Sequence, residues 1–189
     1  MNKENDIEKT IINSLADFID FETNIICSSL LDEKFNDCSF FQNMYIYYGK
    51  NYEHGKSFAE LKGKFGIYLF FINDGINLSY KEVFDFNDCA SGAKFKDYSD
   101  INLTIGDCLY LGSSTSESLY TRMNQHFNDK IEPAALHLSL EKRKMLKNIV
   151  KIYAFPVPDK SIKNIDVLLK AIEKELHNLY EPLAGSNRT

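Results

Sequence analysis

The sequence predicts a small mixed α/β fold in which three core strands are covered by helices. Residues 65–72 form a nearly continuous apolar and aromatic run, which is typical of a buried central strand. Residues 108–112 form a second short apolar segment that ends at a glycine. Residues 149–155 alternate apolar side chains and are followed by two prolines, so they predict the third strand.

Helical patterns follow the second and third predicted strands. The hydroxyl-rich stretch before residue 117 offers N-caps for a helix over 117–128. Pro133 suits the first turn of a further helix over 134–147. A last helix is indicated by apolar residues on one face, and Pro182 ends it. These apolar residues are Ile165, Leu168, Leu169, Ile172, Leu176 and Leu179.

Two regions lie outside this core pattern. Residues 1–60 predict an acidic N-terminal extension with an amphipathic helix over 5–20 and a β-prone segment at 44–48. Residues 73–105 are polar and separate the first two core strands, so they predict an insertion. The predicted core domain therefore covers residues 61–189.

Composition excludes several classes of protein. With 44% apolar and 26% charged residues among 189, the chain is neither disordered nor fibrous. No apolar run approaches the ~20 residues needed to cross a bilayer, and the polar start leads into no signal-type apolar core. The four cysteines show no CxxC spacing, which disfavours a zinc module or a disulfide framework. We therefore expect a cytoplasmic protein with reduced thiols and no membrane partner.

Charge is distributed unevenly along the chain. Residues 1–60 carry 5 lysines and 11 acidic residues, a net charge of −6. Residues 119–151 carry 7 basic and 3 acidic residues, a net charge of +4. The basic stretch is compatible with a local polyanion site. The acidic region would repel duplex DNA unless it faces away, or unless it serves a protein partner or self-association.

Two tripeptides carry a family resemblance. GIY stands at residues 66–68 in the first predicted strand, and YLG stands at 110–112 in the second. With the matches that follow, the chain resembles the GIY-YIG nuclease family over about residues 61–187. The resemblance implies that the small central sheet is antiparallel and flanked by helices. The 42-residue separation of the two motif tyrosines departs from the tight hairpin usual in the family, which makes residues 73–105 an insertion.

Further matches lie on the predicted helices. Arg122 and His126 are four residues apart, which places them on one helical face, and the family has an arginine and often a histidine there. The family also has a glutamate on its last helix, ahead of an apolar residue and a proline. The helical pattern alone does not choose between Glu173 and Glu175. The offset to Pro182 in the family pattern chooses Glu173.

The resemblance implies a role for each matched residue in phosphodiester hydrolysis. Glu173 would bind one Mg²⁺ or Mn²⁺, a hard cation that takes oxygen ligands. Arg122 would hold non-bridging phosphate oxygens in a forked geometry. Tyr68 would act as a base toward water once nearby positive charge favours its phenolate. His126 would position that tyrosine or relay its proton, and Tyr110 would orient the substrate.

Additional nucleic-acid contacts are predicted for a basic stripe on the expected 134–147 helix, although a solvated helix face would give the same pattern. Asn187 falls near the family's asparagine position. The stripe consists of Lys142, Arg143, Lys144 and Lys147.

These features together predict a metal-dependent DNA endonuclease, with restriction or defence as the closest analogy. The alternative is a non-catalytic module that keeps the nuclease scaffold to bind nucleic acid or protein. RNA remains an open substrate, because the proposed chemistry does not use the 2′ hydroxyl.

Overall fold

The structure is a computed structural model, and it describes residues 44–74, 79, 102–128, 135–140, 143–157 and 165–184. Several sequence predictions lie outside these ranges. They are the helix at 5–20, most of the insertion at 73–105, and the basic and amide side chains of Lys142 and Asn187.

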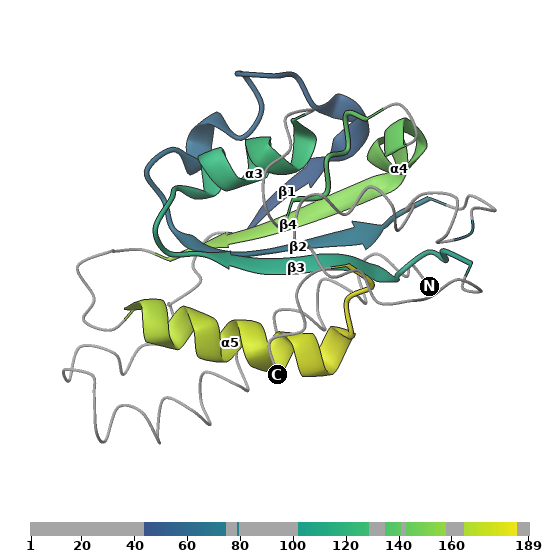
Figure 1. Ribbon diagram of the computed structural model, residues 1–189. Coiled ribbons are helices and arrows are strands. Elements are labelled where there is room, and N and C mark those ends of the chain that lie inside the picture. The colour runs from purple at the N-terminus through teal and green to yellow at the C-terminus, as the bar shows by residue number, and fades with distance from the viewer. Residues whose placement is uncertain are drawn as a thin grey trace.

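A four-stranded antiparallel sheet with the order β1-β4-β2-β3 forms the centre of the described part (Figure 1). Every residue of β2 and β4 is buried, which explains their nearly continuous apolar sequences. The predicted count of three strands is wrong, because the β-prone segment at 44–48 supplies a fourth strand against the edge of β4. The strands are β1 (Tyr45–Tyr48), β2 (Gly66–Ile72), β3 (Cys108–Ser114) and β4 (Val150–Pro156).

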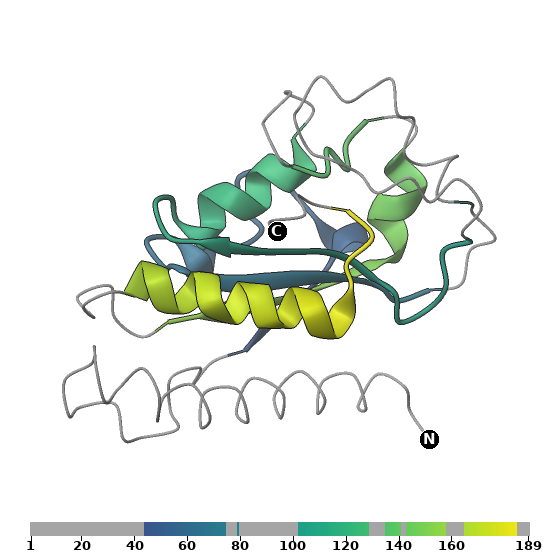
Figure 2. The ribbon, with the colours of Figure 1, turned by 60° about the horizontal axis from the view of Figure 1, so that its bottom comes forward.

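Helices cover both faces of the sheet. Helices α3 (Leu119–Phe127) and α4 (Lys144–Ile149) lie on one face, and α5 (Ile165–Tyr180) lies on the other (Figures 1 and 2). Alternate side chains of the strands therefore enter two separate apolar cores, one under α3 and α4 and one under α5. Helix α3 begins after Ser118, whose Oγ accepts the Thr121 amide. Two 3₁₀ turns, η2 (Gly49–Asn51) and η3 (Ala59–Leu61), complete the described elements.

The predicted helix over 134–147 is wrong for its first half. Residues 135–140 are not helical, and α4 begins only at Lys144. Two backbone amides of this segment donate hydrogen bonds to the end of α3 instead. Leu136 N donates to His126 Nδ1, and Leu138 N donates to the His126 carbonyl. Both leucines are fully buried beneath α3. Burial against the end of α3 therefore overrides local helix propensity here.

Strand β3 forms one edge of the sheet. The chain returns after α5 to pair with its first half, where Leu183 N donates to the Cys108 carbonyl and Ala184 N to the Leu109 carbonyl. Along this edge, the described residues show no such pairing for the second half of β3. That half extends two residues past the predicted end at Gly112, as far as Ser114.

The N-terminal side of the expected boundary at residue 60 contributes to the same core. Strand β1 pairs in the sheet, and Phe58 is buried among the side chains beneath α3. The acidic extension as a whole stays a prediction, because residues 1–43 lie outside the described ranges. Within those ranges, no helix has the length and apolar character to cross a membrane.

Candidate active site

Gly112 makes room for the hydroxyl of Tyr68. The two residues are directly opposite each other in the β2–β3 register. A Cβ added at Gly112 would lie 2.6 Å from Tyr68 Oη and 2.8 Å from its Cζ. No ordinary side chain fits there unless the tyrosine moves. The glycine of the YLG tripeptide is thus required by the position of the tyrosine in GIY.

Gly66, the first residue of the other tripeptide, has a different structural reason. Its φ of +154° lies in a region that side-chain-bearing residues rarely adopt. A Cβ at this position would also collide with the backbone carbonyl of Phe155 on β4. Gly66 therefore permits β4 to lie close to the start of β2. This contact is on the side of β2 opposite to β3.

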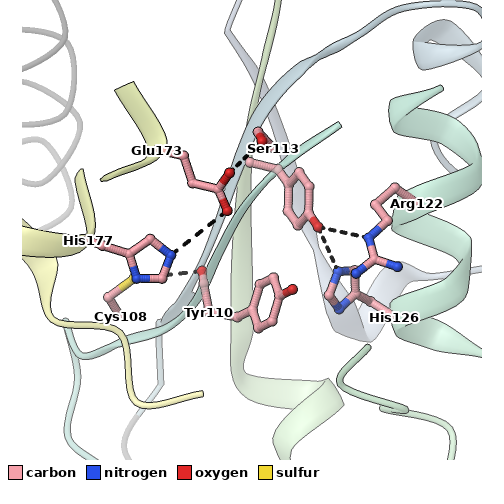
Figure 3. A network of polar contacts seen from close by, with 8 residues as sticks. Cys108, Tyr110, Ser113, Arg122, His126, Glu173 and His177 are labelled. Carbon is pink, nitrogen blue, oxygen red and sulfur yellow. Dashed lines mark hydrogen bonds and ion pairs between the residues drawn. The ribbon is translucent and has the colours of Figure 1, made fainter. Parts of the chain in front are cut away.

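Two donors from α3 converge on Tyr68. Arg122 Nε donates to Tyr68 Oη at 3.1 Å, and His126 Nε2 lies 3.1 Å from the same oxygen (Figure 3). Arg122 and His126 are one helical turn apart, so they approach the oxygen from the same side. The Tyr110 ring stacks beside that of Tyr68, with centroids 6.0 Å apart. The structure thus brings together four of the sequence-predicted residues.

The hydrogen bonds of His126 fix its tautomer. Because Nδ1 accepts the Leu136 amide at 3.1 Å, the ring proton of the neutral imidazole resides on Nε2. His126 therefore donates to Tyr68 Oη. Burial lowers the pKa of His126 well below its usual 6.5, and the nearby Arg122 and His137 act in the same direction. This arrangement supports the predicted positioning role, but not a relay in which Nε2 accepts the tyrosine proton.

Tyr68 is a neutral phenol in this environment. Burial raises its pKa well above 10, and the neighbouring Tyr110 raises it further. Arg122 acts in the opposite direction through its charge and its hydrogen bond, but burial outweighs it. A side-chain hydrogen bond with Tyr110 also favours the protonated form. The charge of Arg122 alone is therefore not enough to make Tyr68 a phenolate, and the phenolate expected beside Arg122 and a metal cation stays a prediction.

Arg122 is held as a cation between two tyrosines. Burial works to lower the pKa of its guanidinium, but Tyr68 and Tyr110 raise that pKa above its usual value. Its Nη1 donates to Gln125 Oε1 at 2.6 Å, which fixes the plane of the group. A fixed, charged fork is suited to phosphate oxygens.

Glu173 approaches β3, the strand that carries Tyr110 and Gly112, from the opposite face of the sheet. It projects from α5 and accepts a 2.5 Å hydrogen bond from Ser113 Oγ at its Oε2. Figure 3 shows Glu173 on one side of the strands and Arg122 on the other. Glu175 is exposed, whereas Glu173 is partly buried against the sheet. The structure therefore distinguishes two glutamates that the helical pattern leaves equivalent.

The groups around Glu173 fit a divalent cation that keeps most of its own water. A partly buried carboxylate at the edge of a sheet, with one oxygen oriented by Ser113, offers the hard oxygen ligand that Mg²⁺ and Mn²⁺ take. Within the described ranges, no cluster of three or more His, Cys, Asp or Glu residues is suited to a metal. Such a cation would therefore complete its shell with water and substrate phosphate.

The predicted basic stripe is only partly at the surface. Arg143 is buried, with 2% of its surface exposed, and its Nη1 donates to the Leu136 carbonyl at 2.7 Å. Its prediction as a nucleic-acid contact is wrong for this reason. Lys144 is exposed, and Lys147 places Nζ 5.2 Å from the Tyr52 ring centroid.

Sequence reasoning missed three groups that contact the candidate site residues. Ser113 follows YLG directly, and His177 lies four residues after Glu173, with Nε2 4.0 Å from Glu173 Oε1. The i,i+4 spacing was the available signal for His177. The Leu136 amide, which sets the tautomer of His126, has no signal in the sequence.

Comparison with known families agrees with this geometry. Residues 66–152 match the family model described as the GIY-YIG catalytic domain. No curated protein and no solved structure matches the chain. A GIY-YIG catalytic domain implies a nuclease and a nucleic-acid substrate, and the family is typically dependent on a divalent metal. The match ends before α5, so it does not include Glu173.

Proposed function

We propose that this protein is a divalent-metal-dependent endonuclease that hydrolyses phosphodiester bonds in DNA and acts in restriction or defence. The observation that carries the proposal is the convergence of Arg122 and His126 on the Tyr68 hydroxyl, within residues that match a nuclease domain. Glu173 lies on the other side of the same edge strand.

Arg122 binds the scissile phosphate. Its guanidinium is held by Tyr68 and Gln125, so it meets the phosphate without reorganising. The charge that develops on the phosphate oxygens in the transition state strengthens this contact. A preorganised donor of this kind contributes about 3–4 kcal/mol in comparable sites.

Tyr68 orients the attacking water and takes its proton. It does so as the phenolate, which has a third lone pair beside the hydrogen bonds from Arg122 and His126 and whose charge Arg122 and the metal cation would favour. After cleavage, the Tyr68 hydroxyl returns this proton to solvent, which restores the phenolate and balances the transfer. His126 holds the Tyr68 oxygen in place during the transfer. General-base assistance of this type contributes about 10²–10⁴-fold in rate.

Glu173 would hold the divalent cation, assisted by the hydrogen bond from Ser113. When bound, the cation supplies electrostatic stabilisation of the phosphate and of the departing oxygen. We also propose that additional contacts to the nucleic acid are made by Lys142, Lys144, Lys147 and Asn187. Lys144 is exposed.

Cleavage assays with purified protein test this function. Supercoiled plasmid, single-stranded DNA and RNA are each incubated with Mg²⁺, Mn²⁺ or EDTA. We expect nicking or linearisation of DNA in either metal, none in EDTA, and none for Glu173→Gln. Glu175→Gln is the matched control, because it removes an exposed carboxylate from the same helix.

Four results would contradict the proposal in whole or in part. Full activity in EDTA would exclude the metal, and full activity of Glu173→Gln would exclude its carboxylate. Binding of DNA without cleavage in any metal would favour the non-catalytic scaffold. Cleavage of RNA alone would keep the nuclease chemistry but change the substrate.

A further inference from the structure

The Glu173 carboxylate has two polar neighbours, of which the proposed mechanism uses only Ser113. Ser113 Oγ donates to its Oε2 at 2.5 Å, and His177 Nε2 lies 4.0 Å from its Oε1. Figure 3 shows this group on the α5 side of the strands, away from Arg122. The side chains of Glu173 and His177 are 14% and 26% exposed, so the pair is sheltered but reachable from solvent.

We propose that His177 is a second protein ligand to the divalent cation at Glu173, and that it makes the site favour transition-metal ions such as Mn²⁺ and Co²⁺ over Mg²⁺. The inference rests on the proposed function, because it takes Glu173 as the metal carboxylate. It goes further by assigning the site a nitrogen ligand and a metal preference.

The chemistry of the two donors gives the preference. Mg²⁺ demands oxygen ligands and loses its waters reluctantly, so an imidazole adds little to its binding. First-row transition-metal ions accept imidazole nitrogen, and their affinity for such sites rises from Mn²⁺ to Co²⁺. A site with Glu173 alone would bind by charge and discriminate little. A site with Glu173 and His177 discriminates by ligand type.

The geometry requires only a small adjustment. Two adjacent ligands of a six-coordinate ion with bonds of about 2.1 Å lie roughly 3 Å apart. Closing the 4.0 Å separation of Glu173 Oε1 and His177 Nε2 therefore needs a movement of about 1 Å. Donors four residues apart on one helical face share a metal in the zinc metalloproteases, so this spacing is workable.

Ser113 defines which carboxylate oxygen is available. Its hydrogen bond occupies Oε2, which leaves Oε1, the oxygen nearer His177, directed toward the histidine. The carboxylate is thus oriented from the sheet, while the histidine comes from the helix. Because both anchors lie within regular elements, the pair is held before a metal arrives.

Metal binding by the purified full-length chain tests the inference without an activity assay. Mn²⁺ affinity is measured by electron paramagnetic resonance, and Mg²⁺ and Co²⁺ affinities by competition against Mn²⁺. Pulsed spectra of the Mn²⁺-bound protein report whether a nitrogen ligand is coupled to the metal. The variants are His177→Ala, His177→Gln and Glu173→Gln, with Asn178→Ala as an exposed control on the same helix.

We expect nitrogen coupling in the wild type and in Asn178→Ala, and none in His177→Ala or His177→Gln. Loss of the ligand should weaken Mn²⁺ and Co²⁺ binding by about tenfold or more and change Mg²⁺ binding by less than about twofold. Circular dichroism and thermal melts establish that each variant is folded, and His177→Gln serves if His177→Ala is not.

Two kinds of failure are distinguishable. If Glu173→Gln abolishes binding but His177→Ala leaves nitrogen coupling and metal preference unchanged, His177 is not a ligand and the proposed function stands. Equal weakening of Mg²⁺ and Mn²⁺ in His177→Ala also overturns the inference, since it indicates a general effect on the carboxylate. If Glu173→Gln retains wild-type Mn²⁺ binding, the metal site of the proposed function fails as well.

Discussion

The buried, neutral state of His126 predicts a loss of stability in acid that the variant His126→Gln should lack. Burial and the nearby Arg122 keep the pKa of this histidine well below 6.5 in the folded protein. In the unfolded chain its pKa returns to about 6.5. Below that pH, His126 binds a proton in the unfolded state but stays neutral in the folded state. The free energy of unfolding therefore falls as the pH falls.

One such proton sets the size of the effect. The free energy of unfolding should change by at most about 1.4 kcal/mol per pH unit below about pH 6.5. Integrated to about pH 5, His126 should cost the folded state roughly 2 kcal/mol, and nothing above about pH 7.5. For a domain whose total stability is about 5–15 kcal/mol, this is measurable.

Urea unfolding between about pH 7.5 and 5 measures this cost, with tyrosine fluorescence as the signal because the chain has no tryptophan. The free energy of His126→Gln minus that of the wild type should rise as the pH falls. The chain has 4 histidines, and the others are common to both proteins, so the difference isolates His126. Parallel curves would refute the neutral, donor state of His126 and reopen its role as a proton acceptor.

Three further predictions concern the cluster around Tyr68. Arg122→Lys should lose about 3–4 kcal/mol of transition-state stabilisation, because one ammonium cannot replace a fork; unchanged turnover would remove it from the site. Tyr68→Phe should abolish single-turnover cleavage with DNA affinity retained, and Tyr110→Phe should be milder; equal activity of Tyr68→Phe and wild type would contradict this. Gly112→Ala should displace the Tyr68 ring, reducing stability by about 1–3 kcal/mol and activity more strongly; a wild-type rate would exclude the clash.

The sequence was most informative where burial is uniform. Strands β2 and β4 are buried on both faces, so their apolar runs predict them to within a residue or two at each end. The last helix likewise shows its apolar stripe directly in the sequence. The fourth strand was less evident, because β1 is a short, partly exposed edge strand whose partner comes from β4, about a hundred residues later in the chain.

The sequence predicted which side chains of the candidate site lie close together, but not their protonation. Spacing places Arg122 and His126 on one face of a helix, but it does not reveal how deeply Tyr68 is buried. That burial raises the pKa of Tyr68, so Arg122 alone does not produce the phenolate and the predicted base depends on the added charge of a metal cation. The tautomer of His126 depends on the Leu136 amide, ten residues away in a segment that the local pattern predicts to be helical.

Gly112 and Ser113 explain how one strand serves both halves of the site. Neighbouring residues in a strand point to opposite faces, so the position opposite Tyr68 faces α3 and the next one faces α5. The absence of a side chain at Gly112 admits the Tyr68 hydroxyl, and the side chain of Ser113 orients Glu173. In the proposed function, a phosphate on Arg122 and a cation on Glu173 would therefore meet at the edge of β3, because the buried strands of the sheet lie between the two groups. A single insertion or deletion at Ser113 would reverse the faces of these positions and uncouple the two halves.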